Sequence, residues 1–161
     1  MNTLRRLWLG ALLLGACLLS ATVWSADLVV TAANVVPAAD AIKVEKTAGA
    51  TITAGQLLYV DTNDNGKVKL AQSDGTALEA TVYGIALNGA SNGQPIIVQT
   101  GGSINPGATV VVGRNYVLST VAGSIAASAD PVSTNYVTYI GVGTSSSNIK
   151  LGILVSGVQV P

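Results

Sequence analysis

The chain has 161 residues with eight basic and eight acidic side chains, so its formal net charge is zero, and its length suits one domain after an N-terminal leader. Histidine is absent, which removes the commonest general base and the commonest transition-metal ligand. No stripe of basic residues with interleaved aromatic residues occurs, and this argues against nucleic-acid binding.

The apolar residues of the chain are mostly small and aliphatic. They make up 49% of the sequence, whereas aromatic residues make up only 4% and Phe is missing, so the core has to be built from Val, Ile, Leu and Ala. With so little aromatic surface to bury, we expect oligomerisation or docking on a partner to add buried area.

The first 26 residues have the three-part layout of a secretory signal peptide. Arg5-Arg6 precedes an apolar run, Leu7–Leu19, which is short for a membrane span, and small residues follow near Ser25-Ala26, where we expect cleavage. Leu14-Gly15-Ala16-Cys17 also resembles a lipoprotein box, so lipidation at Cys17 is one alternative, and an uncleaved apolar N-terminus is another. Contact with a membrane is expected only through this leader.

The stretch that follows, Asp27–Asp40, is apolar and poor in turn residues until Pro37. It predicts either a first strand, Leu28–Ala33, with a linker, or an extended arm that adds to the sheet of a partner through backbone hydrogen bonds. In the second interpretation the partner-binding residues are Leu28, Val29, Val30, Val35 and Val36. We therefore divide the chain into a leader (1–26), an arm with the first strands (27–48) and a β domain (49–161).

Short runs rich in Val, Ile, Thr and Tyr, separated by Gly, Asn, Asp and Pro, dominate the rest of the chain and indicate strands. They predict strands at Ile42–Lys46, Leu57–Asp61, Lys67–Ala71, Thr81–Leu87, Pro95–Thr100, Thr109–Val112, Tyr116–Ser119, Tyr136–Val142 and Asn148–Val155, with Gly157–Val160 as a candidate edge strand. Helical periodicity is lacking, although Ser73–Glu79 or Ser124–Pro131 has room for a short helical turn. Asn65-Gly66 is the strongest hairpin pattern. Together these elements predict an all-β fold, either a compact sandwich or a small barrel.

A weak internal echo occurs within this body. Tyr59-Val60 recurs as Tyr116-Val117, and Gly84-Ile85 recurs as Gly141-Val142, in both cases 57 residues later. The echo fits either an old duplication into two similar β units that face each other, or chance in a sequence rich in Val and Gly.

Asp61, Asn63 and Asn65 resemble the start of a calcium-binding loop, D-x-N-x-N-G. However, Gln72 stands at the twelfth position, where such a loop needs a bidentate carboxylate, and two lysines lie inside the loop. We therefore interpret this segment as a polar hairpin tip and expect neither a metal nor a cofactor. Without histidine, and with the one cysteine, Cys17, in the leader, no activated nucleophile is evident, so we expect the protein not to be an enzyme.

A series of strand–turn–strand phrases occurs in a defined order after Gly49. They are Ala54–Asp61, Asn65-Gly66-Lys67, Ala71 with Ser73-Asp74, Val82–Asn88, Gly93–Gly102, Gly113 with Tyr116–Ser119, Gly123-Ser124-Ile125 and Ile140-Gly141-Val142. Each phrase is common by itself. Their order and spacing together, over Gly49–Pro161, resemble the phage head decoration proteins, also called capsid cement proteins.

The resemblance implies a compact, β-tulip-like domain, often trimeric, on the outer face of an icosahedral shell. There it would bind the major capsid protein or copies of itself, and clamp the shell against internal pressure without catalytic residues. It also implies that Leu28–Val36 corresponds to an arm that pairs with capsid strands. The leader departs from this pattern, because cement proteins assemble in the host cytoplasm. The alternative is a secreted or surface β protein, cleaved near Ser25-Ala26, that builds an extracellular filament or adhesive layer.

Overall fold

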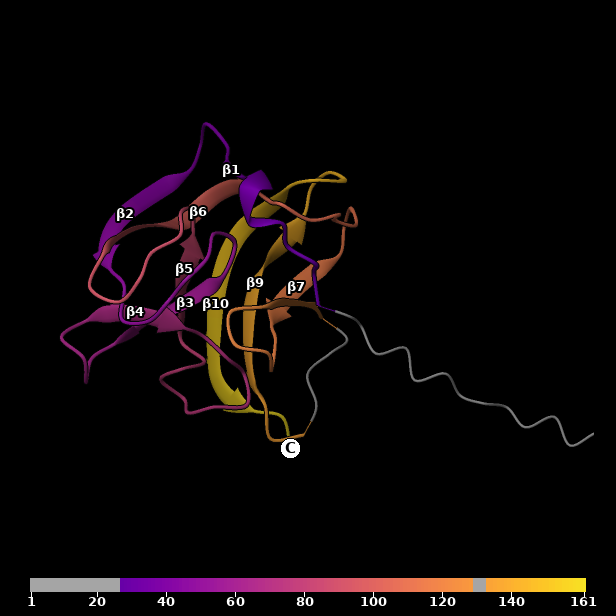
Figure 1. Ribbon diagram of the computed structural model, residues 1–161. Helices are drawn as coiled ribbons and strands as arrows, with labels where there is room; N and C mark the ends of the chain where they lie inside the picture. Colours follow the sequence, from indigo (N-terminus) through magenta and orange to yellow (C-terminus); the bar gives the residue numbers. More distant parts are fainter. Residues whose placement is uncertain (1–26, 129–132) are drawn as a thin grey trace, which may run out of the picture.

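The computed structural model describes residues 27–128 and 133–161. The leader, and with it the predictions of cleavage at Ser25-Ala26 and lipidation at Cys17, lies outside the described residues. Within those residues the regular elements are strands apart from one 3-10 turn, η1 (Ala32–Asn34), and the strands form a curled antiparallel sheet shaped as a half-barrel (Figure 1). The all-β prediction is therefore confirmed. None of the helical segments in the described ranges is long and apolar enough to cross a membrane.

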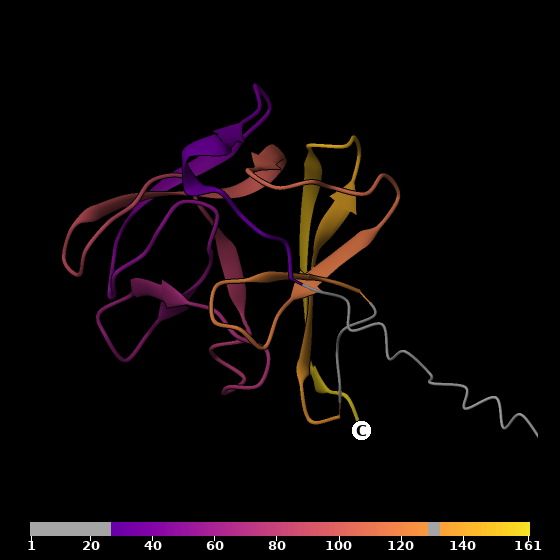
Figure 2. The same ribbon diagram turned by 45° about the vertical axis from the view of Figure 1, so that its right-hand side comes forward.

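The sheet has ten strands, and β6 joins its two halves. The strands are β1 (Val35–Pro37), β2 (Ile42–Thr47), β3 (Leu57–Asp61), β4 (Lys67–Leu70), β5 (Val82–Ala86), β6 (Pro95–Pro106), β7 (Asn115–Leu118), β8 (Ile125–Ala127), β9 (Tyr136–Gly143) and β10 (Ile149–Gln159). Their order is β4-β3-β5-β6-β10-β9-β7-β8, and β1 and β2 also pair with β6. Because β6 pairs with β10, the N-terminal and C-terminal halves of the chain lie side by side. Figure 2 shows the yellow C-terminal strands beside the indigo-to-magenta N-terminal half.

Eight of the predicted strands coincide with β2, β3, β4, β5, β6, β7, β9 and β10, and β10 continues through most of the predicted edge strand Gly157–Val160. The hairpin at Asn65-Gly66 is confirmed. It joins β3 to β4, and both of its residues have positive φ, 53° and 73°, which Asn and Gly adopt most easily. Of the two segments with room for a helical turn, Ser73–Glu79 contains most of one. This turn is closed where the Ala80 N–H donates to the Thr76 carbonyl at 3.1 Å.

Two strand predictions are wrong. In Leu28–Ala33, Leu28 N–H donates to the Ile125 carbonyl and Thr31 N–H to the Gly107 carbonyl, both at 2.8 Å. These bonds go to two separate segments, so they do not form the continuous ladder of a strand. In Thr109–Val112 the backbone donors are also used singly. Val110 N–H donates to a loop carbonyl at 2.9 Å and Val111 N–H to the Tyr116 hydroxyl at 2.9 Å. The predicted helical turn over Ser124–Pro131 is wrong in its described part, because β8 forms there and pairs with β7.

The strand order contains a repeat. The series β4-β3-β5-β6 matches β8-β7-β9-β10 strand for strand, and the two units meet where β6 pairs with β10 at Gly102–Ile104 and Ile149–Leu151. Hydrogen bonds at the start of each unit match as well. Gly55 N–H donates to Ala86 O (2.8 Å) and Ala86 N–H to Gln56 O (2.9 Å), while Gly113 N–H donates to Gly143 O (2.8 Å) and Gly143 N–H to Arg114 O (2.9 Å). This equivalence favours duplication over chance and includes Gly84 and Gly141, but Tyr59 and Tyr116 are one residue out of register, because Leu58 lies opposite Gly84 and Tyr116 opposite Gly141.

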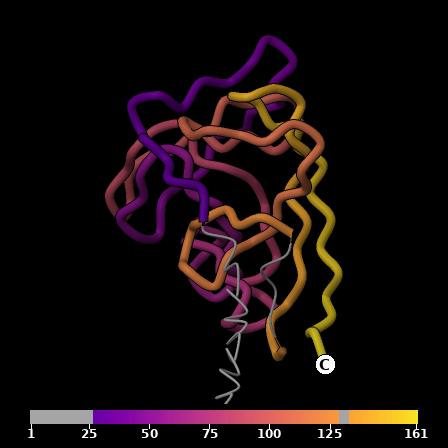
Figure 3. Tube along the Cα trace, turned by 90° about the vertical axis from the view of Figure 1, so that its right-hand side faces the viewer, coloured from indigo at the N-terminus to yellow at the C-terminus, as the bar shows by residue number. Residues whose placement is uncertain are grey.

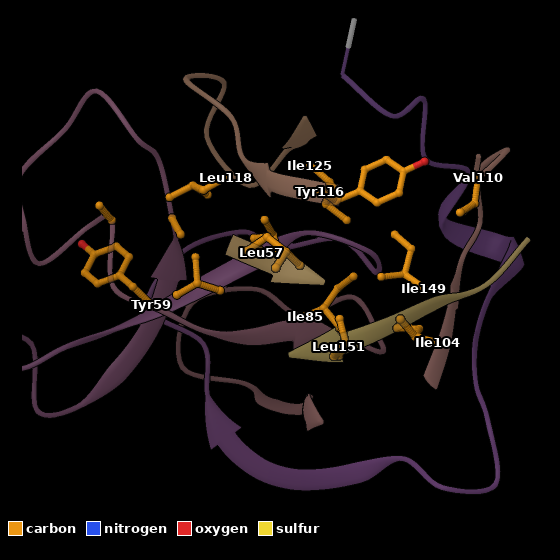
Figure 4. Close-up of a cluster of buried hydrophobic side chains, with 14 residues drawn as sticks. Leu57, Tyr59, Ile85, Ile104, Val110, Tyr116, Leu118, Ile125, Ile149 and Leu151 are labelled. Atoms are coloured by element: carbon orange, nitrogen blue, oxygen red, sulfur yellow. The ribbon is translucent and has the colours of Figure 1, made fainter. Parts of the chain in front are cut away.

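The core has two parts because β3 and its neighbours bury side chains on both faces. Successive residues of a strand point to opposite sides, so Leu57 and Tyr59 enter the cluster between the two units, whereas Leu58 enters a smaller cluster with Val68 and Ile96. Figure 4 shows the larger cluster, in which aliphatic side chains from both units, such as Leu57 and Ile149, lie together with Tyr59 and Tyr116. The buried aliphatic residues therefore link the halves of the sheet.

Candidate partner-binding surface

The five predicted partner-binding residues of the arm divide into two groups. Leu28 and Val35 are partly buried against the larger core cluster, and Val30 lies so close to Gly55 that a Cβ added there would be 2.4 Å from the Val30 Cγ1. Val29 and Val36 instead are 86% and 56% exposed. The arm is therefore held on its own domain by three side chains, and two side chains remain available to a partner.

The two exposed valines border an open groove of about 570 Å³. One wall is the arm and the other is the connection that follows β6. The lining residues are Val29, Thr31, Ala33, Asn34, Val36, Asn105, Gly107, Ala108, Thr109 and Ser147, and none of them carries a charge. We call this site the arm groove.

The arm is anchored to the opposite wall by backbone contacts. Thr31 N–H donates to the Gly107 carbonyl at 2.8 Å, and β1 pairs with the end of β6 from Val35 opposite Pro106 to Pro37 opposite Ile104. These contacts join segments about seventy residues apart in the sequence. By its composition Pro106-Gly107 indicates only a turn, and nothing local to it indicates a neighbouring arm.

The arm groove offers binding but no acid–base chemistry. Its polar side chains are the hydroxyl and amide groups of Thr, Ser and Asn, which donate and accept hydrogen bonds without titrating near neutral pH. Across residues 27–128 and 133–161, no cluster of three or more His, Cys, Asp or Glu side chains is placed to hold a metal ion. This geometry suits an uncharged segment of another protein.

No protein-family model matches this chain, and no curated protein matches it. The role of the arm groove is therefore inferred from its own geometry and from the sequence resemblance.

The calcium-like turn holds a cation supplied by the chain itself. The Lys69 ammonium lies 2.8 Å from Asp61 Oδ2 and 3.0 Å from Asp64 Oδ2. Asp61 also accepts the backbone N–H of Asn63 at 2.9 Å, while Asn65 forms the hairpin turn with its positive φ. The two carboxylates thus already neutralise a positive charge, in agreement with their interpretation as a hairpin tip.

Ion pairs lower the pKa values of three aspartates in the folded protein. Hydrogen bonds from Lys69 lower the pKa of Asp61 and of Asp64, and for Asp64 a second bond from Lys67 adds to this effect. The Lys150 ammonium, followed by the Ser103 N–H, lowers the pKa of Asp40 from 3.8 to about 2. Asp40 therefore links the β1–β2 connection to both β6 and β10.

These shifts predict a loss of stability in acid. A carboxyl group whose pKa is lower in the folded chain stabilises the fold above its unfolded pKa, here 3.8, and this contribution disappears as the pH falls through the folded value, about 2 for Asp40. The thermal midpoint should stay level from about pH 7 to pH 5 and fall between about pH 4 and pH 2. The variants Lys69→Met and Lys150→Met should flatten this fall, whereas Lys43→Met, on the exposed strand β2, should not. Differential scanning calorimetry at each pH measures the midpoint, and equal profiles for all three variants would contradict the assignment.

Proposed function

We propose that the protein is a non-enzymatic structural protein that decorates the outer surface of a phage capsid, with the arm groove as its contact to the major capsid protein. The observation that carries the proposal is the uncharged arm groove, bordered by the exposed Val29 and Val36. The resemblance of Gly49–Pro161 to capsid cement proteins supports it, because their arm region corresponds to the segment that forms one wall of this groove.

The chemistry of the groove favours a protein partner over a small charged ligand. Burying Val29 or Val36 against an apolar surface stabilises a complex, whereas a charged ligand would find no opposite charge among the lining residues. The hydroxyl, amide and backbone groups around the valines supply the polar rim that protein interfaces usually have. A segment of a capsid subunit lying along the arm satisfies both requirements.

A second candidate function is a subunit of an extracellular filament or adhesive layer. The observation that favours it is the layout of residues 1–26, which is typical of a secretory signal peptide. This protein would use the same groove to contact a neighbouring subunit outside the cell.

The variant Val29→Lys tests the proposed contact. Val29 is 86% exposed, so the fold should tolerate lysine there, but the new ammonium would be buried without a partner on binding. We expect an affinity at least about tenfold lower for capsid shells assembled without this protein, measured by co-sedimentation. Val121→Lys is the matched control, because Val121 is also exposed (58%) but lies outside the arm groove.

Two results would contradict this function. One is equal binding of wild type, Val29→Lys and Val121→Lys to the shells, which would exclude the arm groove. The other is no binding of the wild-type protein to shells of its own phage, together with recovery of the protein in an extracellular assembly.

A further inference from the structure

Most strand edges in the described part of the chain are protected against pairing with another molecule. The edge of β4 is covered by Gly49, whose N–H donates to the Val68 carbonyl at 2.8 Å, and the edge of β8 is covered by Leu28, which bonds the Ile125 carbonyl at 2.8 Å. β2 carries two lysines and a glutamate, and β1 ends in Pro37. Charges, proline and covering segments are the usual means by which proteins block strand edges.

The outer half of β10 lacks this protection. Beyond Leu151, β10 separates from β6, and Gly152–Gln159 pairs only with β9 among the strands of the described residues. No charged residue occurs from Gly152 to the end of the sequence, and Leu154 and Val158 are 68% and 65% exposed. Figure 3 shows the yellow C-terminal segment running down one side of the molecule to the C-terminus.

The repeat shows what covers the corresponding edge in the other unit. β6 is the equivalent of β10. Its edge that faces away from β5 is paired with β2, from Thr47 opposite Pro95 to Ile42 opposite Gly101, and β1 continues along the same edge. β2 thus covers the edge of β6 that corresponds to the edge of β10 facing away from β9. Within residues 27–128 and 133–161, no strand equivalent to β2 lies beside the outer half of β10. The pairing of β2 with β6 shows that the fold accepts a strand along an edge of this kind.

We propose that the edge Gly152–Gln159 of β10 pairs with the same edge of a second copy of the chain, in antiparallel orientation about a two-fold axis. Such pairing is self-complementary, because the N–H groups of this edge in one copy donate to the carbonyl groups of the same edge in the other copy, and the reverse. The absence of charge removes the like-charge repulsion that would oppose self-pairing. The pairing rests on β10 and the repeat, and does not depend on what the arm groove binds.

The register follows from the shape of the strand. Bulges interrupt β10 between Leu151 and Leu154 and again between Val155 and Gln159, where Gly157 has a φ of 66°, so the pairing with β9 is regular at Leu154 and Val155. An axis beside Leu154, whose side chain is 68% exposed, places it opposite Leu154 of the second copy on the outer face. A single strand pair is a small contact, below roughly 1,200 Å², which is typical of weak, concentration-dependent association.

Sedimentation velocity of the full-length chain over a concentration series tests this inference. Wild type should shift from monomer to dimer as concentration rises, and Leu154→Lys should remain monomeric, because two ammonium groups would face each other across the axis. Val121 is also exposed (58%) but lies in a loop, so Val121→Lys should dimerise like wild type. Circular dichroism spectra identical to wild type would show that the variants keep the fold.

A cysteine variant tests the register. In the full chain with Cys17→Ser, Leu154→Cys introduces the sole thiol, and mild oxidation should produce a disulfide-linked dimer faster than Val121→Cys does. A wild-type monomer at every concentration would overturn the inference, as would a trimer, which a two-fold contact cannot form. Dimerisation of Leu154→Lys equal to wild type would overturn it too. If only capsid binding were lost in Leu154→Lys, the edge would belong to the capsid and not to a second copy.

Discussion

Replacing Gly141 by Ala is expected to lower the free energy of unfolding by about 3 kcal/mol. A Cβ at Gly141 would lie 2.2 Å from the Lys150 carbonyl oxygen, a backbone atom of the neighbouring strand β10 that cannot move aside alone. The equivalent glycine of the first unit, Gly84, should respond in the same way, because its Cβ would lie 2.5 Å from the Gln99 carbonyl oxygen of β6. Both strands would have to separate from their partners to make room.

Urea denaturation of the two variants measures the free energy of unfolding. A loss of this size also corresponds to a thermal midpoint about 10 °C lower. The matched control is Gly152→Ala in β10, where an added Cβ meets nothing within 4 Å, so its stability should stay close to that of wild type. Similar stability of Gly141→Ala and Gly152→Ala would contradict the close approach of β9 to β10.

Truncating Tyr116 should have the largest effect on stability of the changes considered. Its side chain is 1% exposed and belongs to the larger core cluster, so Tyr116→Ala should cost about 3–5 kcal/mol. Tyr116→Phe keeps the ring and removes only the hydroxyl, which accepts the Val111 N–H at 2.9 Å, and should cost about 1 kcal/mol.

The phenylalanine variant also tests a link between the core and the arm groove. The Tyr116 hydroxyl holds the connection from β6 to β7, and Thr109 of this connection lines the groove. Hydrogen exchange of the Val111 amide should therefore be faster in Tyr116→Phe, while exchange in β3 should stay the same. Unchanged exchange at Val111 would show that the hydroxyl does not hold this connection.

The repeat explains why a short echo in the sequence was informative. Gly84 and Gly141 are required by the close approach of two backbones, which leaves no room for any side chain. Tyr59 and Tyr116 both enter the larger core cluster, but their positions in β3 and β7 differ by one residue, since Leu58 lies opposite Gly84 and Tyr116 opposite Gly141. Glycines at close approaches keep their residue type, while the surrounding Val, Ile and Leu can exchange with one another at small cost.

Much of the fold could be predicted from local pattern. Asn65-Gly66 specifies a hairpin by its backbone preferences, and β3 was evident because Leu57–Asp61 is an apolar run of strand length. The three-residue strands β1 and β8 were missed, since so short a segment shows no periodicity. Their pairing is decided by contacts distant in sequence.

The candidate site was predictable only in part. The apolar arm was evident, yet the sequence could not separate the residues that hold it from those that remain exposed. That division depends on Gly55, which leaves space for Val30, and on the Gly107 carbonyl, which bonds Thr31. The free edge of β10 likewise depends on strand order, although the charge-free run from Gly152 onward was visible in the sequence.

The central proposal, that this chain coats a phage capsid, is tested most directly by intact mass measurement and N-terminal sequencing of the chain in purified virions. We predict that virions contain the chain together with the major capsid protein, and that its N-terminus there is Met1 or another uncleaved residue. A chain that begins near Ala26, found in the extracellular fraction with no capsid protein co-purifying, would contradict the proposal and identify a secreted structural protein.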